Sequence, residues 1–317
     1  MAKSLTLLFP GQGSQAVGMG NRFAANTHYG LFKQASAKLN FDLHQMITGG
    51  SEDELKMTFN AQPAILSYSI ILYRILLDTL SSKNVNIDCV LGHSLGEYSA
   101  LCAAGTLSFE DAVWAVHMRG KFMQEAVPAN TGSMVAIMKA SESMVRQACI
   151  EASQNDSQVM PANFNEPHQI VISGHLEACL RASKLIVEKS EGKARTIPLK
   201  VSAPFHSSYM QPAALKLQEF FSDYHFKSNN IPYIANINAC EYKVGTDVQT
   251  IKNNLIQQMT GSVLWTQAIS KLPENTICLE VGPGKVLTGL VSKINPKLKV
   301  IPLDTDGGFN ELKEIIS

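Results

Sequence analysis

Cys89-Val90-Leu91-Gly92-His93-Ser94-Leu95-Gly96-Glu97 places a short apolar run directly before the pattern G-x-S-x-G, in which Ser94 is the central serine. Residues 97–104 then have a helix-like pattern that ends at Gly105. A sharp strand-to-helix turn lifts a serine hydroxyl out of the backbone and aims it at the helix N-terminus, where N–H groups and the helix dipole favour an oxyanion. The segment therefore predicts strand, turn and helix, with Ser94 as a nucleophile. The alternative is a tight turn whose serine only caps the helix.

The composition is that of a globular protein with one large core or two modest ones. The chain has 317 residues, of which 45% are hydrophobic and 17% charged. Lys+Arg and Asp+Glu each number 27, and this balance gives no support for a nucleic-acid partner. The six cysteines are scattered without a C-x-x-C pair, which favours reduced, buried thiols in a cytoplasmic protein and indicates no metal site.

No segment near the N-terminus or in the interior predicts a membrane protein. The chain runs from Met1 straight into a strand-like segment, without the apolar region and cleavage site of a signal peptide. The longest apolar region, residues 64–77, is shorter than a bilayer span and contains Arg74. We therefore expect a buried helix there, no membrane insertion and a cytoplasmic location.

Strand-like and helical segments alternate along the chain, which predicts an α/β protein. Strands are expected at residues 5–9, 89–93, 233–236, 276–281 and 299–302, and helices at 51–57, 64–80, 108–125 and 213–221. Ser108 followed by Asp111 is a capping box that opens the third of these helices.

The segment 130–200 has a different order of elements. Strand-like runs at 133–138, 158–163, 169–173 and 194–199 are interrupted by helical stripes at 142–153 and 176–189, with residues 165–168 between the second and third strands. The order βαββαβ is the ferredoxin-like arrangement. We therefore expect residues 130–200 to form a small subdomain, inserted into an α/β catalytic subdomain made of residues 1–129 and 201–317.

A serine hydroxyl needs a base within hydrogen-bond reach. His206 is the best of the eight histidines, because it lies in the loop-like stretch Ser202-Ala203-Pro204-Phe205-His206, just after the last strand of the small subdomain. The alternative is an ordinary surface-loop histidine. His93 belongs to the turn, and we expect its side chain to point elsewhere. No acid has a persuasive setting, Asp111 and Asp156 included, but a backbone carbonyl can orient the imidazole as well.

Two further polar residues are candidates for the site. Gln12 lies between two glycines in a turn after the first strand, and its backbone N–H could pair with that of Leu95 as an oxyanion hole. Arg119 lies on the 108–125 helix, and its planar fork matches a carboxylate. The alternative for Arg119 is a solvated helix arginine.

Taken together, these motifs resemble those of the malonyl-CoA:acyl carrier protein transacylases of fatty acid synthesis and the related polyketide acyltransferases. The resemblance covers nearly the whole chain. It rests on residues 9–15 (FPGQGSQ), 92–97 (GHSLGE), 118–120 (MRG), Asn163 with Asn165 and Pro167, 171–174 (VISG), 202–206 (SAPFH) and 280–290 (EVGPGKVLTGL). It implies an α/β-hydrolase-like large subdomain with a ferredoxin-like insert.

The resemblance also implies a role for each matching residue. Ser94 would be acylated and His206 would be its base, oriented by the backbone carbonyl of Gln258 or of its neighbour Gln257. Gln12 and Leu95 would supply the oxyanion hole. The substrate-binding residues would be Arg119, which would hold the malonyl carboxylate, Asn163 in a supporting role, and Phe205, whose ring together with Leu95 favours malonyl over methylmalonyl.

The implied reaction is ping-pong transfer of a malonyl group from malonyl-CoA, through a malonyl-serine, to the phosphopantetheine thiol of acyl carrier protein, with no cofactor. Carrier proteins of this kind are acidic, so basic residues are docking candidates. They are Lys189, Lys193, Arg195 and Lys200, with an ordinary solvated face as the alternative. Three rival functions stay open: a serine hydrolase, a polyketide-pathway acyltransferase, and a carrier-binding scaffold without activity.

Overall fold

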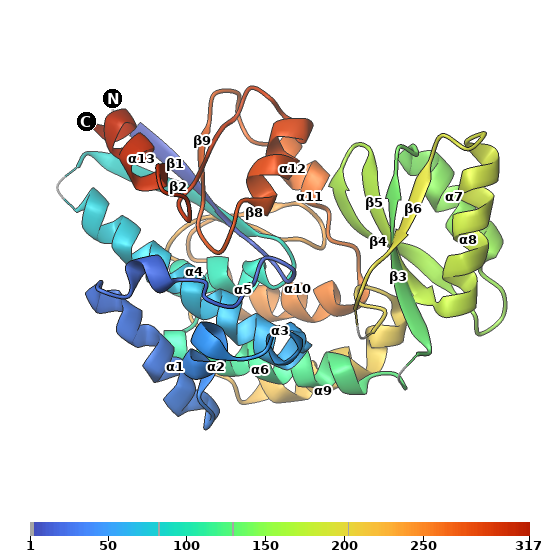
Figure 1. The fold of residues 1–317 in the computed structure, drawn as a ribbon, viewed down its shortest axis with the longest axis horizontal. Coiled ribbons are helices and arrows are strands. Elements are labelled where there is room, and N and C mark those ends of the chain that lie inside the picture. Colours follow the sequence, from blue (N-terminus) through green and yellow to red (C-terminus); the bar gives the residue numbers. More distant parts are fainter. Residues whose placement is uncertain (1–2, 82, 129, 202) are drawn as a thin grey trace.

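The chain folds into a mixed α/β structure with two separate sheets (Figure 1). The computed structural model describes residues 3–81, 83–128, 130–201 and 203–317. Ser202, part of the SAPFH motif, and residues 1 and 129, which end the expected first segment, lie outside the described residues. The two ends of the described chain are close together, since Lys3 Nζ donates to the carbonyl of Ile315.

The larger sheet has the strand order β10-β9-β1-β2-β7-β8. All neighbours in it are parallel except β7 and β8. The strands are β1 (Lys3–Phe9), β2 (Val85–Gly92), β7 (Tyr233–Ile234), β8 (Glu241–Tyr242), β9 (Ile277–Glu280) and β10 (Lys299–Pro302). The elbow at Ser94 follows β2, and the FPGQG turn follows the adjacent β1, so both turns lie at the same edge of the sheet.

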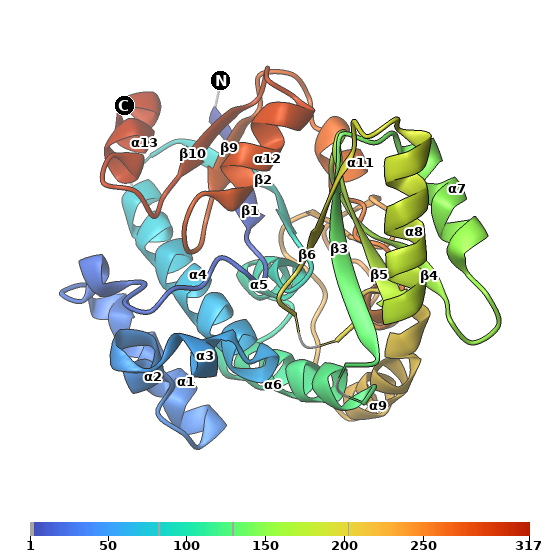
Figure 2. The same ribbon diagram turned by 45° about the vertical axis from the view of Figure 1, so that its right-hand side comes forward.

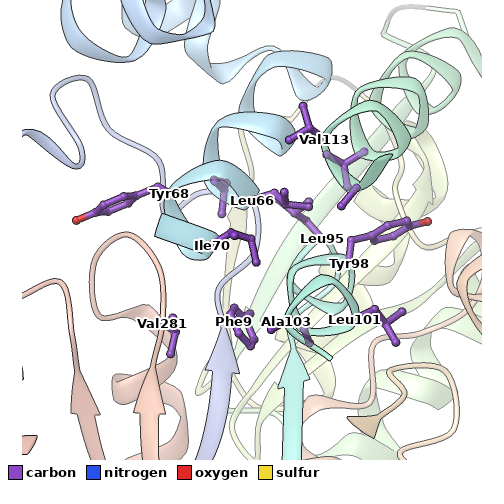
Figure 3. Close-up of a cluster of buried hydrophobic side chains, with 14 of the residues drawn as sticks. Phe9, Leu66, Tyr68, Ile70, Leu95, Tyr98, Leu101, Ala103, Val113 and Val281 are labelled. Carbon is purple, nitrogen blue, oxygen red and sulfur yellow. The ribbon is translucent and has the colours of Figure 1, made fainter. Parts of the chain in front are cut away.

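Central strand β1 is buried on both faces, which explains its nearly continuous apolar sequence. Side chains alternate along a strand, so Leu7 and Phe9 join one hydrophobic cluster while Leu8 joins another. The first cluster packs against the helices that carry Leu66 and Leu95 (Figure 3). The central strands are therefore held from both sides.

Helices cover both faces of this sheet (Figures 1 and 2). They are α1 (Leu31–Leu39), α2 (Leu43–Gly49), α3 (Glu52–Lys56), α4 (Thr58–Leu80), α5 (Gly96–Ala103), α6 (Phe109–Glu125), α9 (Gln211–Ser222), α10 (Val248–Thr260), α11 (Trp265–Ser270), α12 (Val286–Ile294) and α13 (Gly308–Ile316). Short 3-10 turns are η1 (Asn21–Phe23), η2 (Thr27–Gly30) and η3 (Ser208–Met210). The Ser108 cap is confirmed, because its Oγ accepts from Asp111 N–H at 3.1 Å where α6 begins.

Helix α4 is longer than the sequence indicates. It has 23 residues, enough by length and composition to cross a membrane, and 72% of its most apolar window is buried inside the protein. The expected length was wrong because Pro63 does not end the helix. Proline removes the N–H that would bond to the Phe59 carbonyl four residues earlier. That carbonyl instead accepts from His117 Nδ1 on α6 at 2.8 Å. The expectation of a buried helix is confirmed.

The smaller sheet is entirely antiparallel, with the order β4-β5-β3-β6. Its elements are β3 (Gly132–Met138), α7 (Glu142–Ala152), β4 (Val159–Glu166), β5 (Gln169–His175), α8 (Leu176–Lys189) and β6 (Arg195–Pro198). Helices α7 and α8 lie together beside this sheet (Figures 1 and 2) and share a hydrophobic cluster with it. This is the strand and helix order that the sequence predicts.

Some details differ from the sequence predictions. Strand β4 continues to Glu166, so only Pro167 and His168 separate it from β5. Six helices were not predicted: α1, α2 and α10 to α13. All six cysteines are free thiols, but the expectation that all are buried was wrong, because Cys240 is exposed and Cys102 is half-buried.

Candidate active site

Ser94 lies in the sharp turn between β2 and α5 with a left-handed backbone, φ 52°. The turn needs glycine on both sides of the serine. A Cβ on Gly92 would lie 1.9 Å from the backbone carbon of Gly96, and a Cβ on Gly96 would lie 2.0 Å from the Phe9 carbonyl oxygen. The amide N–H of Ser94 is held by Asn236 Oδ1 at 2.7 Å. These contacts fix the strained turn.

His206 reaches Ser94 from the opposite wall of the site. Its Nε2 lies 2.7 Å from Ser94 Oγ, and its Nδ1 lies 2.9 Å from the backbone carbonyl of Gln258 on α10. A carbonyl only accepts, so Nδ1 carries the proton and Nε2 presents a lone pair to the serine hydroxyl. Burial, and to a smaller extent the nearby Arg119 charge, lower the pKa of His206 to about 3. The free imidazole is therefore neutral at pH 7.

Among the described residues, the His206 ring bonds to Ser94 Oγ and to the Gln258 carbonyl and to no carboxylate. Asp111 serves the N-terminus of α6, and the Asp156 carbonyl accepts from Tyr209. Of the two neighbouring glutamines considered, Gln258 supplies the carbonyl. Serine, histidine and carbonyl thus form a hydrogen-bonded chain of three groups.

The backbone N–H groups of Leu95 and Gln12 are available to an oxyanion. Neither donates to an acceptor within the described part of the chain. Leu95 directly precedes α5 as its N-cap residue, at the helix end where unbonded N–H groups point outward. Gln12 is brought alongside because the two turns are joined by a bond of 3.0 Å from His93 N–H to the Phe9 carbonyl. Both residues line the same cleft as Ser94.

Arg119 is buried at the inner end of this cleft, with 1% of its surface exposed. It lies on the apolar face of α6, four residues before Met123 and three after Val116, so the interpretation as a solvated arginine is wrong. Its Nη1 donates to Gln62 Oε1 at 2.8 Å, and its Nη2 donates to Gln258 Oε1 at 2.9 Å and to Ser94 Oγ at 3.3 Å. Burial lowers its pKa from the ordinary value. Within the described residues, the side chains that accept hydrogen bonds from Arg119 are all neutral.

The cleft has a volume of about 350 Å³ and lies between the two sheets. Of the predicted site residues, only Gln258 does not line it, and Gln258 contacts the site through His206 and Arg119. The lining residues are Gln12, Ser94, Leu95, Arg119, Asn163, Phe205 and His206. Asn163 on β4 forms an isolated backbone β-bridge with Val263, which lies between α10 and α11. His93 was expected to point away, but it also lines the cleft, held by Asn165 Oδ1 at 2.8 Å. In the described chain, no group of three metal-ligating side chains is present.

Three buried polar side chains of the site were missed by the sequence analysis as functional residues. They are Gln62, Glu97 and Asn236. Glu97 Oε2 accepts from Gln258 Nε2 at 2.7 Å and from the Asn236 N–H at 3.2 Å. Burial raises the pKa of Glu97 to about 7. For Glu97 the signals were its place in the GHSLGE motif and its charge in the otherwise apolar start of α5.

The four basic docking candidates fall into two pairs. Lys189 is bonded to Glu151 at 2.5 Å and Lys193 to Glu191 at 3.1 Å. Arg195 and Lys200 have no acidic partner among the described residues, and Lys200 lines the cleft. Of the four candidates, only Lys200 combines an unpaired charge with a place in the cleft of Ser94.

The chain is similar to known acyltransferases over most of its length. The family model described as the acyl transferase domain matches residues 6–297. A malonyl CoA-acyl carrier protein transacylase of Bacillus subtilis (strain 168) is 43% identical over 301 residues, which cover 94% of this chain and 92% of that protein.

Solved structures agree over the same length. The malonyl CoA-acyl carrier protein transacylase from Coxiella burnetii superposes with a TM-score of 0.92 at 34% identity, covering 100% of this chain and 98% of that one. A second structure holds a type II polyketide synthase acyl carrier protein in complex with its malonyl-transacylase. It has a TM-score of 0.90 at 34% identity and covers 99% of this chain and 100% of that one.

Proposed function

Because this chain belongs to the malonyl-CoA:acyl carrier protein transacylase family of acyltransferases, we propose that it moves a malonyl group from malonyl-CoA to the phosphopantetheine thiol of an acyl carrier protein in fatty acid synthesis. The observation that carries this proposal is the chain Ser94 Oγ, His206 and Gln258 carbonyl, with the Arg119 guanidinium within 3.3 Å of the same Oγ. A nucleophile and a fixed positive charge share one cleft.

In the first half-reaction His206 Nε2 takes the proton of Ser94 Oγ as that oxygen attacks the thioester carbon. The N–H groups of Leu95 and Gln12 stabilise the oxyanion of the tetrahedral intermediate. The carbon–sulfur bond then breaks, and the CoA sulfur leaves with the proton from His206. A malonyl ester remains on Ser94.

The second half-reaction reverses these steps with a new thiol. His206 takes the proton of the phosphopantetheine thiol, whose sulfur attacks the malonyl-serine carbonyl. Ser94 leaves with the proton from His206, and the malonyl group is carried away as a thioester. Since His206 is neutral at pH 7, it can act as base at the start of both half-reactions.

Arg119 selects the acyl group. The guanidinium is buried; Nη1 keeps one N–H after bonding Gln62, and the second N–H of Nη2 points toward Ser94 Oγ, the atom that carries the acyl group. A malonyl carboxylate supplies the missing negative charge, whereas an acetyl group leaves the charge uncompensated. Phe205, with 6% of its surface exposed, narrows the cleft and disfavours a methyl branch. Asn163 supports the opposite wall.

We also infer the finer architecture. The mostly parallel sheet with its elbow supports an α/β-hydrolase-like catalytic subdomain of residues 1–129 and 201–317. The antiparallel order β4-β5-β3-β6 with two helices supports a ferredoxin-like subdomain at 130–200. The burial of α4 argues against its crossing a membrane, and the six free thiols support a cytoplasmic enzyme.

The proposal is tested by intact mass after mixing the protein with malonyl-CoA or acetyl-CoA. We expect a malonyl adduct that is weak with acetyl-CoA, absent in Ser94→Ala, and discharged by acyl carrier protein. Release of CoA with no adduct would instead indicate the serine hydrolase. Neither adduct nor release would favour the scaffold, and discharge only by a polyketide carrier protein would favour that pathway.

A further inference from the structure

The side-chain amide of Gln258 joins groups that its backbone does not touch. Its Oε1 accepts from Arg119 Nη2 at 2.9 Å, while its Nε2 donates to Glu97 Oε2 at 2.7 Å and to the Ser94 carbonyl at 3.0 Å. The reverse amide orientation would turn N–H groups toward the guanidinium and the oxygen toward the carboxylate. The chemistry of its neighbours therefore fixes which way this amide points.

Of the two acceptors of the Gln258 amide nitrogen, the Glu97 carboxylate forms the shorter hydrogen bond. The side chain has 1% of its surface exposed and does not line the cleft, so it does not reach the substrate. Its Oε2 bonds both Gln258 Nε2 and the N–H of Asn236, whose side chain holds the Ser94 N–H. A buried bond to an ionised group is stronger than one between neutral groups. Glu97 thus anchors the amide from the side away from Arg119.

In this arrangement the Glu97 carboxylate is separated from the Arg119 guanidinium by the side-chain amide of Gln258. Arg119 is bonded directly by the neutral oxygens of Gln62 and Gln258, which hold its plane from α4 and α10. A carboxylate in direct contact would neutralise the charge that a substrate carboxylate needs. An amide between Glu97 and Arg119 passes on orientation without forming that ion pair.

We propose that Glu97 is a positioning residue for acyl selectivity, which holds the Arg119 guanidinium ready for the malonyl carboxylate through the side-chain amide of Gln258. The inference rests on the malonyl transfer proposed above. Without an acceptor at position 97, the amide nitrogen keeps only its bond to the Ser94 carbonyl, and the amide can turn its oxygen away from Arg119. Malonyl loading then falls, whereas acetyl loading does not use the Arg119 orientation.

The test compares kcat/KM for acyl-Ser94 formation from malonyl-CoA and from acetyl-CoA, at pH 8. Glu97→Met keeps the volume but removes the acceptor, and we expect the malonyl-to-acetyl ratio to fall about tenfold or more. Glu97→Gln keeps an oxygen for Gln258 Nε2, so its ratio should stay within about threefold of the unaltered protein. Glu280→Met is the matched control, because Glu280 is a fully buried carboxylate that caps α12 outside the cleft.

A double-mutant cycle separates positioning from general destabilisation. Gln258→Met should lower the ratio as Glu97→Met does, and the double variant should lower it no further. An unchanged ratio in Glu97→Met, or in Gln258→Met if the former does not fold, would overturn the proposal. So would equal losses for both acyl groups or additive losses in the double variant. If the unaltered protein shows no malonyl adduct, the proposed function itself fails.

Discussion

At the scale of single residues, the site depends on two groups whose charge states are set by burial. Arg119 remains a cation because guanidinium keeps its proton even where burial lowers its pKa. His206 is neutral because burial disfavours the imidazolium and the Arg119 charge repels it. One side chain is therefore ready to bind an anion and the other to accept a proton.

Replacing Arg119 with alanine should change which acyl group is loaded. Bonds to a charged partner contribute about 1.5–3 kcal/mol, so malonyl loading should fall by roughly ten- to a hundredfold. Acetyl loading should fall less, because it no longer faces an uncompensated charge. The measurement is the rate of acyl-enzyme formation with each CoA ester. Arg74→Ala, on the exposed side of α4, is the control. Unchanged preference in Arg119→Ala would contradict the assignment.

The low pKa of His206 predicts an unusual pH profile. A depressed pKa means that the base stays unprotonated until the pH approaches about 3. An ordinary histidine, with a pKa near 6.5, would lose about tenfold in activity by pH 5.5. Glu97 titrates near pH 7, so the profile is measured in Glu97→Gln with malonyl-pantetheine, which carries no phosphate. We expect kcat/KM to be flat between pH 5.5 and 8, and a tenfold drop would refute the pKa.

At the scale of elements, the elbow is held by backbone contacts that exclude any side chain at Gly92 and Gly96. Strand β2, helix α5 and the end of β1 meet there with no space for a Cβ. The turn also holds Ser94 at positive φ, a conformation that costs about 1–3 kcal/mol. Close packing of these three elements keeps the serine in place.

Gly92→Ala should therefore destabilise the whole protein. Its Cβ would overlap the backbone of Gly96, and overpacking of this kind typically costs about 1–3 kcal/mol or more. Gly289→Ala is the matched control, since this exposed residue of α12 has open space at its Cβ. Alanine favours a helix by about 1 kcal/mol over glycine, so Gly289→Ala should raise the melting temperature. Equal melting temperatures in the two variants would count against this account.

Local patterns predicted the elements that carry the nucleophile better than those that support it. The elbow could be predicted because its glycines and its serine lie within five consecutive residues. Helix α10 was not predicted, and the position of the Gln258 carbonyl came from family resemblance rather than from its own surroundings. Asn236 was predicted only as the end of the strand 233–236, of which β7 forms Tyr233–Ile234, and nothing in that short run indicates a contact with the elbow. Its contact with Ser94 spans 142 positions and exists only in the folded chain.

At the scale of the whole molecule, the cleft exists because the two sheets are joined at its rim. His93 of the elbow bonds to Asn165 of β4, and the Asn163–Val263 bridge adds a backbone link. Lys293 of α12 lies 3.5 Å from the Glu166 carboxylate of the same strand. The sequence analysis predicted two subdomains and the residues of each. It did not predict these contacts between the two sheets, because they join positions that are distant in the sequence.

The net charge of zero means that docking of an acidic carrier protein depends on local charge. Lys200 lines the cleft without an acidic partner among the described residues, whereas Lys189 is already neutralised by Glu151. Lys200→Gln should therefore raise the KM for carrier protein several-fold, and Lys189→Gln should have little effect. The transfer is measured from preloaded malonyl-enzyme at two salt concentrations, which removes any dependence on CoA phosphates. The Lys200→Gln defect should shrink at high salt, because screening already weakens the attraction in the unaltered protein. Salt-insensitive transfer would place the docking surface elsewhere.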